Sequence, residues 1–400
     1  MGGHYCKYCK GWHPKFYGDG YCPLQNQFKL FQTKDINVNF SGSSPPDIFV
    51  GRHNYPSVFS GILSPVGHDD ESNRMSDPEE WFKSKLSSDD ILFKRSQLVY
   101  SRFVNNIKNP NGRLNDVMQE VSMAYKPCDV EFNLKKRPTI NVNTDAVANP
   151  LGNVAPLRKA KVIGNVKIAK KVDYFVDDIH LKSADAVVDL HKSGFSVSSV
   201  IKLLSAGLLG IKPQRKLVPS RWSTTAVDDT ISKHLLSNIR DYPWINDIMV
   251  FSDEYLGNHY EILLLPRSWS FEVIEAKANM DPHFWHDYEI VFNRKKYAGD
   301  VTGAYYSNKL AVTEYLNEIK RQASVVFFRE INNYEVPLGV GILREVSRNA
   351  FRKKFRRFNN LKEAFEDIQT RIKSPFFKYV AKSKIIEEYK KQTSLRSFIQ

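Results

Sequence analysis

The stretch of residues 244–335 constrains the fold most, because it alternates short apolar runs with turn residues. The runs at 247–251, 261–265 and 270–274 are rich in Ile, Val, Leu and Phe. Such runs predict strands, and their close spacing predicts that the three strands are consecutive and antiparallel. A helix is expected over residues 304–321, followed by a central strand over residues 323–331.

Two further patterns complete the predicted fold. Residues 184–192 have a helical pattern closed by Gly194, and Ser196 would then cap a second helix that ends near Gly207. Residues 47–50 form an apolar run that leads into a turn at 51–56. We therefore predict an α+β protein with an antiparallel-rich mixed sheet as its core and flanking helices.

No stretch of the 400 residues resembles a membrane span. A bilayer-spanning helix needs about 20 apolar residues, and the N-terminus also lacks the apolar centre of a signal peptide. We expect a cytoplasmic, nucleoid-associated protein without a membrane partner. Three of the four cysteines lie within the first 22 residues, which predicts a metal site rather than a disulfide framework.

The chain carries a formal net charge of +14, which favours a polyanionic partner such as DNA. Residues 352–400 contribute strongly, with 14 Lys and Arg against 5 Asp and Glu. Apolar residues recur in this region at helical spacing, at Leu361, Ala364, Phe365, Ile368 and Ile372. We predict a basic helical segment that contacts DNA. The alternative is a solvated helix with no role in binding.

The N-terminal cysteines have the spacing of a zinc knuckle. A C-x₂-C pair is followed by a histidine and, after a Gly-Asp-Gly turn, by a third cysteine. The expected Zn²⁺ ligands are Cys6, Cys9, His13 and Cys22. Such a set suits a closed structural site, and metal would supply much of the folding energy of so short a segment. His4 and Cys128 are alternatives for the fourth ligand.

The last nine residues place a glutamine, a leucine and an aromatic at intervals of three, followed by one more apolar residue. These are Gln392, Leu395, Phe398 and Ile399. Residues three apart eclipse one another in a 3₁₀ turn, so the first three would share an edge. The pattern resembles the PIP box, the peptide by which replication and repair proteins dock on the sliding clamp PCNA. Ile399 stands where the pattern usually has a second aromatic residue, so we predict a smaller apolar contact with the clamp. A chance pattern in a frayed tail is the alternative.

A central stretch offers groups that hold a phosphate and stack a base, namely a guanidinium, an indole and hydroxyls. The candidate phosphate- or nucleotide-binding residues are Arg52, Arg221, Trp222, Thr224, Thr225 and Asn258. Carboxylates and a histidine nearby could act in catalysis or bind Mg²⁺ or Mn²⁺. These candidates are Asp228, Asp229, His259 and Glu261. The competing interpretation is structural: a buried cation–π contact between Arg221 and Trp222, followed by helix N-caps.

Several longer blocks accompany the cysteine cluster and the tail, at residues 217–229, 255–261, 305–306, 337–340 and 344–345. Together they resemble the archaeal Nre family of DNA repair proteins, in the form with a C-terminal PCNA-binding motif. The resemblance covers nearly the whole chain and implies a DNA-damage-response role, an N-terminal zinc finger and clamp binding. The family's finger has four cysteines, whereas this region has three, so His13 would take the remaining place.

The leading hypothesis is therefore a DNA repair factor that binds DNA, is recruited to PCNA and meets other repair proteins. A metal- or nucleotide-dependent nuclease or phosphohydrolase acting on DNA ends or nucleotides is the second hypothesis, and an RNA-binding protein is the third. The expected divisions are a zinc-knuckle segment (1–40), an α+β core (41–345), a basic helical segment (346–391) and a clamp-docking tail (392–400).

Overall fold

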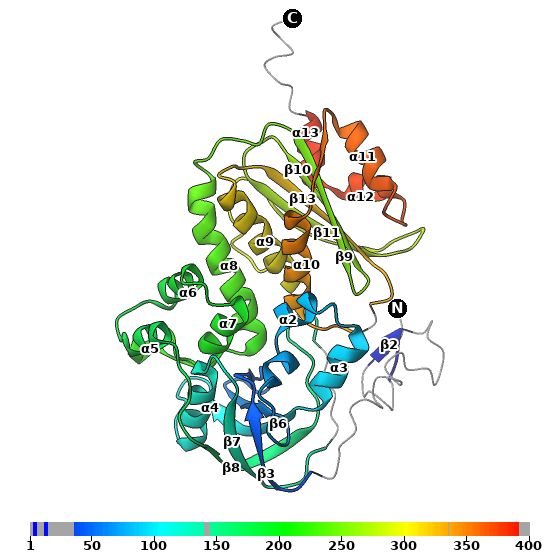
Figure 1. The fold of residues 1–400 in the computed structure, drawn as a ribbon. Coiled ribbons are helices and arrows are strands. Elements are labelled where there is room, and N and C mark those ends of the chain that lie inside the picture. Colours follow the sequence, from blue (N-terminus) through cyan, green and yellow to red (C-terminus); the bar gives the residue numbers. More distant parts are fainter. Residues whose placement is uncertain (1–2, 6–11, 15–35, 140–144, 335, 392–400) are drawn as a thin grey trace, which may run out of the picture. The chain divides into compact units, whose positions relative to one another are not determined.

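A computed structural model of the protein describes residues 3–5, 12–14, 36–139, 145–334 and 336–391. It confirms a mixed α+β fold, with two six-stranded sheets (Figure 1). The chain divides into two compact units. Unit 1 comprises Met1–Thr230 and Glu335–Gly341, and unit 2 comprises Ile231–Tyr334 and Ile342–Gln400. A separate two-stranded sheet pairs β1 (Gly3–Tyr5) with β2 (Trp12–Pro14).

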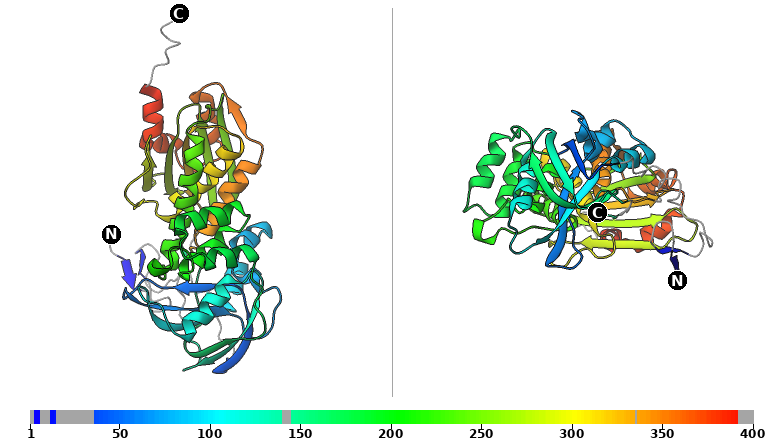
Figure 2. Two further views of the ribbon diagram at one scale, coloured as in Figure 1. Left: turned by 90° about the vertical axis from the view of Figure 1, so that its left-hand side faces the viewer. Right: turned by 90° about the horizontal axis from the view of Figure 1, so that it is seen from below.

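The sheet of unit 1 has the strand order β3-β7-β8-β6-β5-β4, and its β6–β8 pair is parallel. The strands are β3 (Asn39–Ser44), β4 (Ile48–Val50), β5 (Ser57–Ser64), β6 (Val99–Asn106), β7 (Cys128–Leu134) and β8 (Val154–Val162). The sheet curls, and Gly42 of β3 thereby forms an isolated bridge to Gly67, beyond the end of β5 (Figure 2). A Cβ on Gly42 would lie 1.9 Å from the carbonyl oxygen of Pro65, so a side chain does not fit at this approach.

The helices of unit 1 are short except for α8, which begins in this unit. They are η2 (Ser72–Met75), α2 (Pro78–Lys83), α3 (Ser88–Ser96), α4 (Arg113–Met123), α5 (Lys170–Asp177), α6 (Ser183–Lys192), α7 (Val197–Ser205), η3 (Lys212–Gln214) and the start of α8 (Ser220–Ile239). The predicted pair α6 and α7 is confirmed. Ser196 caps α7 as expected, since its hydroxyl oxygen accepts a hydrogen bond of 3.1 Å from the amide of Ser199.

The sheet of unit 2 has the order β12-β11-β13-β10-β9-β14. Its strands are β9 (Ile248–Tyr255), β10 (Asn258–Leu265), β11 (Ser270–Lys277), β12 (Phe284–Glu289), β13 (Ser324–Ile331) and β14 (Arg356–Phe358). The antiparallel β9–β10 pair and the central place of β13 match the prediction. The expected β10–β11 pair is wrong, because β13 lies between them and runs parallel to β11. Residues 324–330 of β13, which include the apolar run 325–328, are all buried, as expected of a central strand.

Helices cover both faces of the sheet of unit 2 (Figure 1). On one face, α9 (Gly303–Glu318) and α10 (Val340–Arg352) pack through aromatic contacts such as Phe251 with Tyr315 and Phe351. On the other, α11 (Leu361–Gln369), α12 (Phe376–Lys382) and α13 (Lys384–Lys391) share one apolar core with the strands. Thus the helices of the predicted basic segment pack onto this sheet. Among the described residues, none of the helices has the length and apolar character of a membrane span.

Candidate nucleic-acid interface

Arg52 and Arg221, two of the residues predicted to bind phosphate, line the same pocket in unit 1. Arg52 lies in the connection between β4 and β5, and Arg221 lies in the first turn of α8. The pocket has a volume of about 170 Å³, and its polar lining consists of Arg52, His53, Asp145, Asn149 and Arg221. We call it the arginine pocket. Its two sides are tied together, because the amide of Val50 donates a 2.9 Å hydrogen bond to the hydroxyl of Ser220 at the start of α8.

Asp145 fixes the guanidinium of Arg221 within this pocket. The Nη1 atom of Arg221 lies 2.5 Å from Oδ1 of Asp145, and each side chain is about one-quarter exposed. The same oxygen accepts hydrogen bonds from the amides of Val147 and Ala148. Burial acts to raise the pKa of Asp145, but these hydrogen bonds and the charge of Arg221 hold it below its usual value. Arg52 is exposed, and no ion pair joins it to a described residue, so it leaves the pocket with net positive charge.

An exposed aromatic pair adjoins these arginines in the sequence. The rings of Tyr55 and Trp222 have centroids 5.9 Å apart and an interplanar angle of 43°. Each side chain is 45% exposed. Trp222 is therefore not the buried partner of a cation–π contact that the structural interpretation expected. Aromatic rings at a basic surface are the groups on which unpaired bases stack.

Other candidates on α8 serve the helix itself. The Thr224 hydroxyl donates to the carbonyl of Ser220 at 2.8 Å, and the Thr225 hydroxyl donates to the carbonyl of Trp222 at 3.2 Å. Both threonines are buried, and neither lines the arginine pocket. Asp228 is fully buried in the same helix, while Asp229 is half-buried. Both aspartates have polar or electrostatic partners within the protein.

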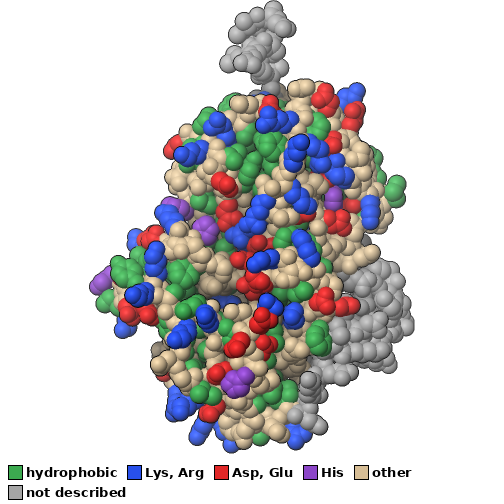
Figure 3. All heavy atoms as spheres, viewed as in Figure 1, with side chains coloured by type: hydrophobic (Ala, Val, Ile, Leu, Met, Phe, Trp, Pro, Cys, Tyr) green, Lys and Arg blue, Asp and Glu red, His purple; other side chains and the backbone are tan. Residues whose placement is uncertain are grey.

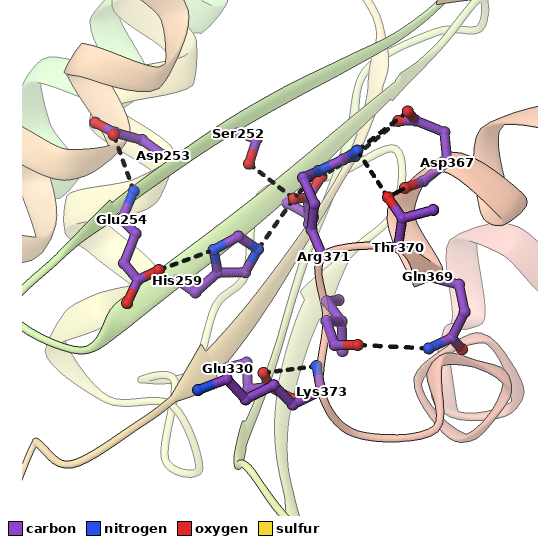
Figure 4. A network of polar contacts seen from close by, with 12 residues as sticks. Ser252, Asp253, Glu254, His259, Glu330, Asp367, Gln369, Thr370, Arg371 and Lys373 are labelled. Atoms are coloured by element: carbon purple, nitrogen blue, oxygen red, sulfur yellow. Dashed lines mark hydrogen bonds and ion pairs between the residues drawn. The ribbon is translucent and has the colours of Figure 1, made fainter.

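Glu261 and His259, the candidate catalytic pair of unit 2, belong to one buried network (Figure 4). Glu261 on β10 is fully buried, and its oxygens accept hydrogen bonds from Arg371 at 2.7 and 2.8 Å. His259 lies 3.0 Å from Glu261, and the Ser252 hydroxyl lies 2.7 Å away. Burial acts to raise the pKa of Glu261, but the hydrogen bonds from His259, Arg371 and Ser252 and the charge of Arg371 hold it low. Its carboxylate is thus committed to joining β10 to the loop after α11.

Asn258 occupies the interior of unit 2 rather than the arginine pocket. Its side-chain oxygen accepts a 3.1 Å hydrogen bond from Nε of Arg329, whose Nη1 atom lies 2.7 Å from Glu275. All three side chains are buried. Asn258 therefore orients a buried ion pair. Across the described part of the chain, no group of three or more His, Cys, Asp and Glu side chains is placed to hold a metal ion.

The predicted zinc and clamp motifs fall largely outside the described residues. Cys6, Cys9 and Cys22 lie there, as do the four predicted tail residues Gln392, Leu395, Phe398 and Ile399. The backbone of His13, on β2, pairs directly with that of His4, on β1. Cys128 is buried on β7, and burial, with the nearby charges of Glu120 and Asp129, raises the pKa of its thiol to about 12. A thiol of this kind is a poor Zn²⁺ ligand, because the metal binds thiolate.

Comparison with known proteins places this architecture in a family. The model described as "Archaeal Nre, N-terminal" matches residues 16–284, and the model described as "Archaeal Nre, C-terminal" matches residues 289–398. The chain belongs to the archaeal Nre family. It is 35% identical to the DNA repair protein NreA of Haloferax volcanii over 325 residues, which cover 78% of this chain and 77% of that protein.

Two Nre proteins of Archaeoglobus fulgidus match over more of the chain. The DNA repair protein NreB is 32% identical over 381 residues, covering 93% of this chain and 95% of its own length. The DNA repair protein NreA is 32% identical over 405 residues, covering 98% of each chain. No solved structure matches this Nre protein.

Sequence reasoning missed three contributors to these sites. Asp145 lies far from Arg221 in sequence, and Tyr55 was interpreted only as part of a turn. Arg371 was counted as part of a basic helix, although it is the main partner of Glu261. A short aromatic-and-basic run, Arg52 to Tyr55 between two strands, was the available signal for the first site.

Proposed function

We propose that this Nre protein is a DNA repair factor that binds DNA at the arginine pocket and is recruited to PCNA by its C-terminal tail. The names of its Nre relatives support the repair role. The observation that carries DNA binding is the convergence of Arg52 and Arg221 on one pocket, next in sequence to the exposed Tyr55–Trp222 pair.

These groups suit contact with the backbone of DNA and with an unpaired base. A guanidinium binds phosphate oxygens through two parallel hydrogen bonds, and phosphate contacts position a protein without reading sequence. An exposed indole and phenol offer stacking surfaces to any base. We therefore expect binding with little sequence preference and a strong dependence on salt.

The test of DNA binding is a salt titration with a fluorescent oligonucleotide. Arg52→Ala should weaken binding and lower the slope of log K against log salt by about 0.7–0.9, which is the value of one phosphate contact. Because Arg221→Ala alone would leave Asp145 unpaired, the second variant combines Arg221→Ala with Asp145→Ala. Lys192→Ala, at an exposed lysine of α6 that does not line the pocket, is the matched control. Unchanged affinity and slope in both pocket variants would refute the proposal.

The clamp interaction rests on the C-terminal sequence. Burying Leu395, Phe398 and Ile399 would contribute about 1.5–3 kcal/mol each to the free energy of binding. The loss of conformational and rigid-body freedom on docking offsets a large share of this gain. The remainder corresponds to roughly micromolar affinity. Calorimetry with PCNA should lose its signal when residues 392–400 are deleted or when Leu395 and Phe398 are both changed to Ala. Arg396→Ala should keep the signal. Clamp binding that survives the deletion would show that the tail is not the docking peptide.

A further inference from the structure

The connection between β12 and α9, in unit 2, presents apolar side chains to solvent. We call residues 290–297 the Phe292 loop. Phe292 is 83% exposed, more than any other large apolar side chain of the described residues, and its neighbour Val291 is 56% exposed. Tyr297, at the end of the loop, is 50% exposed. Isolated exposed apolar residues are common on protein surfaces, whereas three within one short loop form an apolar tip that a partner could cover.

Polar contacts fix the backbone around this tip. Arg240, directly after α8, donates a 3.1 Å hydrogen bond from Nη2 to the carbonyl oxygen of Val291. Arg294 donates a 2.9 Å hydrogen bond from Nη1 to the carbonyl oxygen of Tyr288, at the end of β12. The loop is therefore held from both α8 and β12. Because the backbone that carries Phe292 is already ordered, less conformational freedom is lost when a partner binds.

The Phe292 loop is also basic. Residues 290–297 include Arg294, Lys295 and Lys296 and contain no Asp or Glu. Arg294 forms an ion pair of 2.9 Å with Asp287, whereas Lys295 and Lys296 are exposed and no ion pair joins them to a described residue. On the face of the protein shown in Figure 3, Lys and Arg side chains are interspersed with Asp and Glu. A loop with two unpaired cations beside an apolar tip favours an anionic partner.

We propose that Phe292 inserts between two stacked base pairs of duplex DNA, while Lys295 and Lys296 contact the adjacent phosphates. This inference rests on the proposed function, since it assumes that the protein acts on DNA. Several DNA-bending proteins insert apolar side chains, Phe among them, between base steps, which partly unstacks the step and kinks the duplex. An anionic membrane fits less well, because anchoring in its interface uses the long apolar face of a helix, and this loop offers only a short tip.

The test uses the full chain and two DNA duplexes of about 20 base pairs, one intact and one with a central nick. Each duplex carries 2-aminopurine at its central step, an adenine analogue whose fluorescence is quenched by stacking. Insertion of Phe292 should raise the fluorescence when the wild-type protein binds. The rise should be larger at the nick, because a step that is already damaged costs less energy to unstack.

Variants of the loop then identify the inserted residue. Phe292→Ala should lose most of the fluorescence rise but weaken duplex binding only about 2- to 10-fold, because it forgoes both the burial of the ring and the cost of unstacking. Phe292→Leu keeps an apolar side chain and should retain part of the rise. Phe377→Ala is the matched control, since Phe377 on α12 of the same unit is 68% exposed. Thermal melting verifies that each variant is folded.

The two lysines are tested separately by a salt titration. The double variant Lys295→Ala/Lys296→Ala should lower the slope of log K against log salt by about 1.8, the value of two contacts with duplex phosphates. Lys192→Ala is again the control. An unchanged slope in the double variant would contradict the phosphate contacts assigned to the loop.

The outcomes separate this inference from the proposed function. Loss of the fluorescence rise in Phe292→Ala, with the rise kept in Phe377→Ala, supports the insertion. Wild-type protein that binds DNA without a rise, or an equal rise in Phe292→Ala, would overturn the insertion and leave the proposed function intact. Binding to anionic lipid vesicles that is lost in Phe292→Ala, with its DNA fluorescence unchanged, would assign the loop to a membrane instead. Wild-type protein that binds neither duplex would refute the proposed function and the insertion together.

Discussion

Arg371 and Glu261 meet through two hydrogen bonds, in which Nε and Nη2 of the guanidinium each reach a different carboxylate oxygen, at 2.7 and 2.8 Å. The residues are 110 positions apart in the chain. Glu261 is fully buried on β10, and Arg371 follows α11, so the pair fastens the C-terminal helices to the central sheet of unit 2 (Figure 4). Glu261 therefore has a structural role.

Glu261→Gln should destabilise the protein by about 1.5–3 kcal/mol, the value of hydrogen bonds to a charged group. The loss stays below that of a fully buried ion pair, because Arg371 is 24% exposed and retains Asp367 at 2.7 Å. Urea unfolding, monitored by circular dichroism, should show this loss of stability as a lower urea concentration at the midpoint. Glu366→Gln is the matched control, since Glu366 is 66% exposed and its Lys362 partner is 4.0 Å away. An equal change in both variants would contradict the role assigned to Glu261.

Acid should weaken unit 2 through carboxylates whose pKa is lowered in the folded state. For Glu261 and Glu330, burial acts to raise the pKa, but hydrogen bonds hold it below the ordinary value of 4.5. Their contribution is complete above pH 4.5 and is lost as the pH falls through the lower folded pKa. The melting temperature should therefore drop below pH 4.5, and the drop should be shallower in Glu261→Gln. A parallel pH profile in that variant would exclude Glu261 as a source.

Asp145→Asn should strengthen DNA binding, by roughly 2- to 5-fold at low salt. The change removes a negative charge from the arginine pocket while an amide oxygen remains to accept from Val147 and Ala148. A charge difference near a surface is worth about 1 kcal/mol and is screened by salt, so the gain should shrink at high salt. Anisotropy titrations at two salt concentrations measure it. Weaker binding at both would mean that aligning Arg221 matters more than removing the charge.

Trp222→Ala should weaken binding of a single strand by about 1–3 kcal/mol, the range for one stacked base. Trp222→Phe should recover part of this loss, because a ring remains beside Tyr55. Trp244→Ala provides the control, since Trp244 in unit 2 is similarly exposed, at 48%. Quenching of tryptophan fluorescence by the oligonucleotide offers a second readout that should fall in Trp222→Phe. Identical quenching in wild type and Trp222→Phe would show that the indole does not contact DNA.

The N-terminal segment should hold one Zn²⁺ per chain, as measured by mass spectrometry of the purified protein. Cys6→Ser and Cys9→Ser should each lose the metal, because a closed site needs all four ligands. Cys128→Ser should retain it, since burial keeps that thiol protonated. His13→Ala and His4→Ala then decide which histidine completes the set. Metal retained in Cys6→Ser and Cys9→Ser would contradict the knuckle.

The sequence predicted those features that depend on neighbouring residues. Ser196 and the apolar pattern of 197–205 were enough to place α7, and the pattern of residues 323–331 was enough to predict the central strand that is β13. The position of β13 between β10 and β11 could not be predicted, because strand order depends on a crossover through α9 rather than on local pattern.

Which candidate residues share a site also depends on distant parts of the chain. Arg52 and Arg221 were named from their residue type, but only the fold shows that they line one pocket. Thr224 and Asn258 were named on the same grounds and prove to be committed to internal hydrogen bonds. The partner of a polar side chain decides whether that side chain is available to a ligand, and the partners of these residues come from distant segments or from the turn of a helix.

Glu272 anchors α13, the helix that precedes the C-terminal tail. This fully buried carboxylate on β11 accepts from the Ser383 hydroxyl and from the amides of Lys384 and Ile385, which begin α13. The helix ends at Lys391, and the nine residues that follow can span at most about 30 Å. A sliding clamp that binds the tail would therefore keep the end of α13 within about 30 Å of the clamp surface. The protein could then act only on DNA that lies close to the clamp.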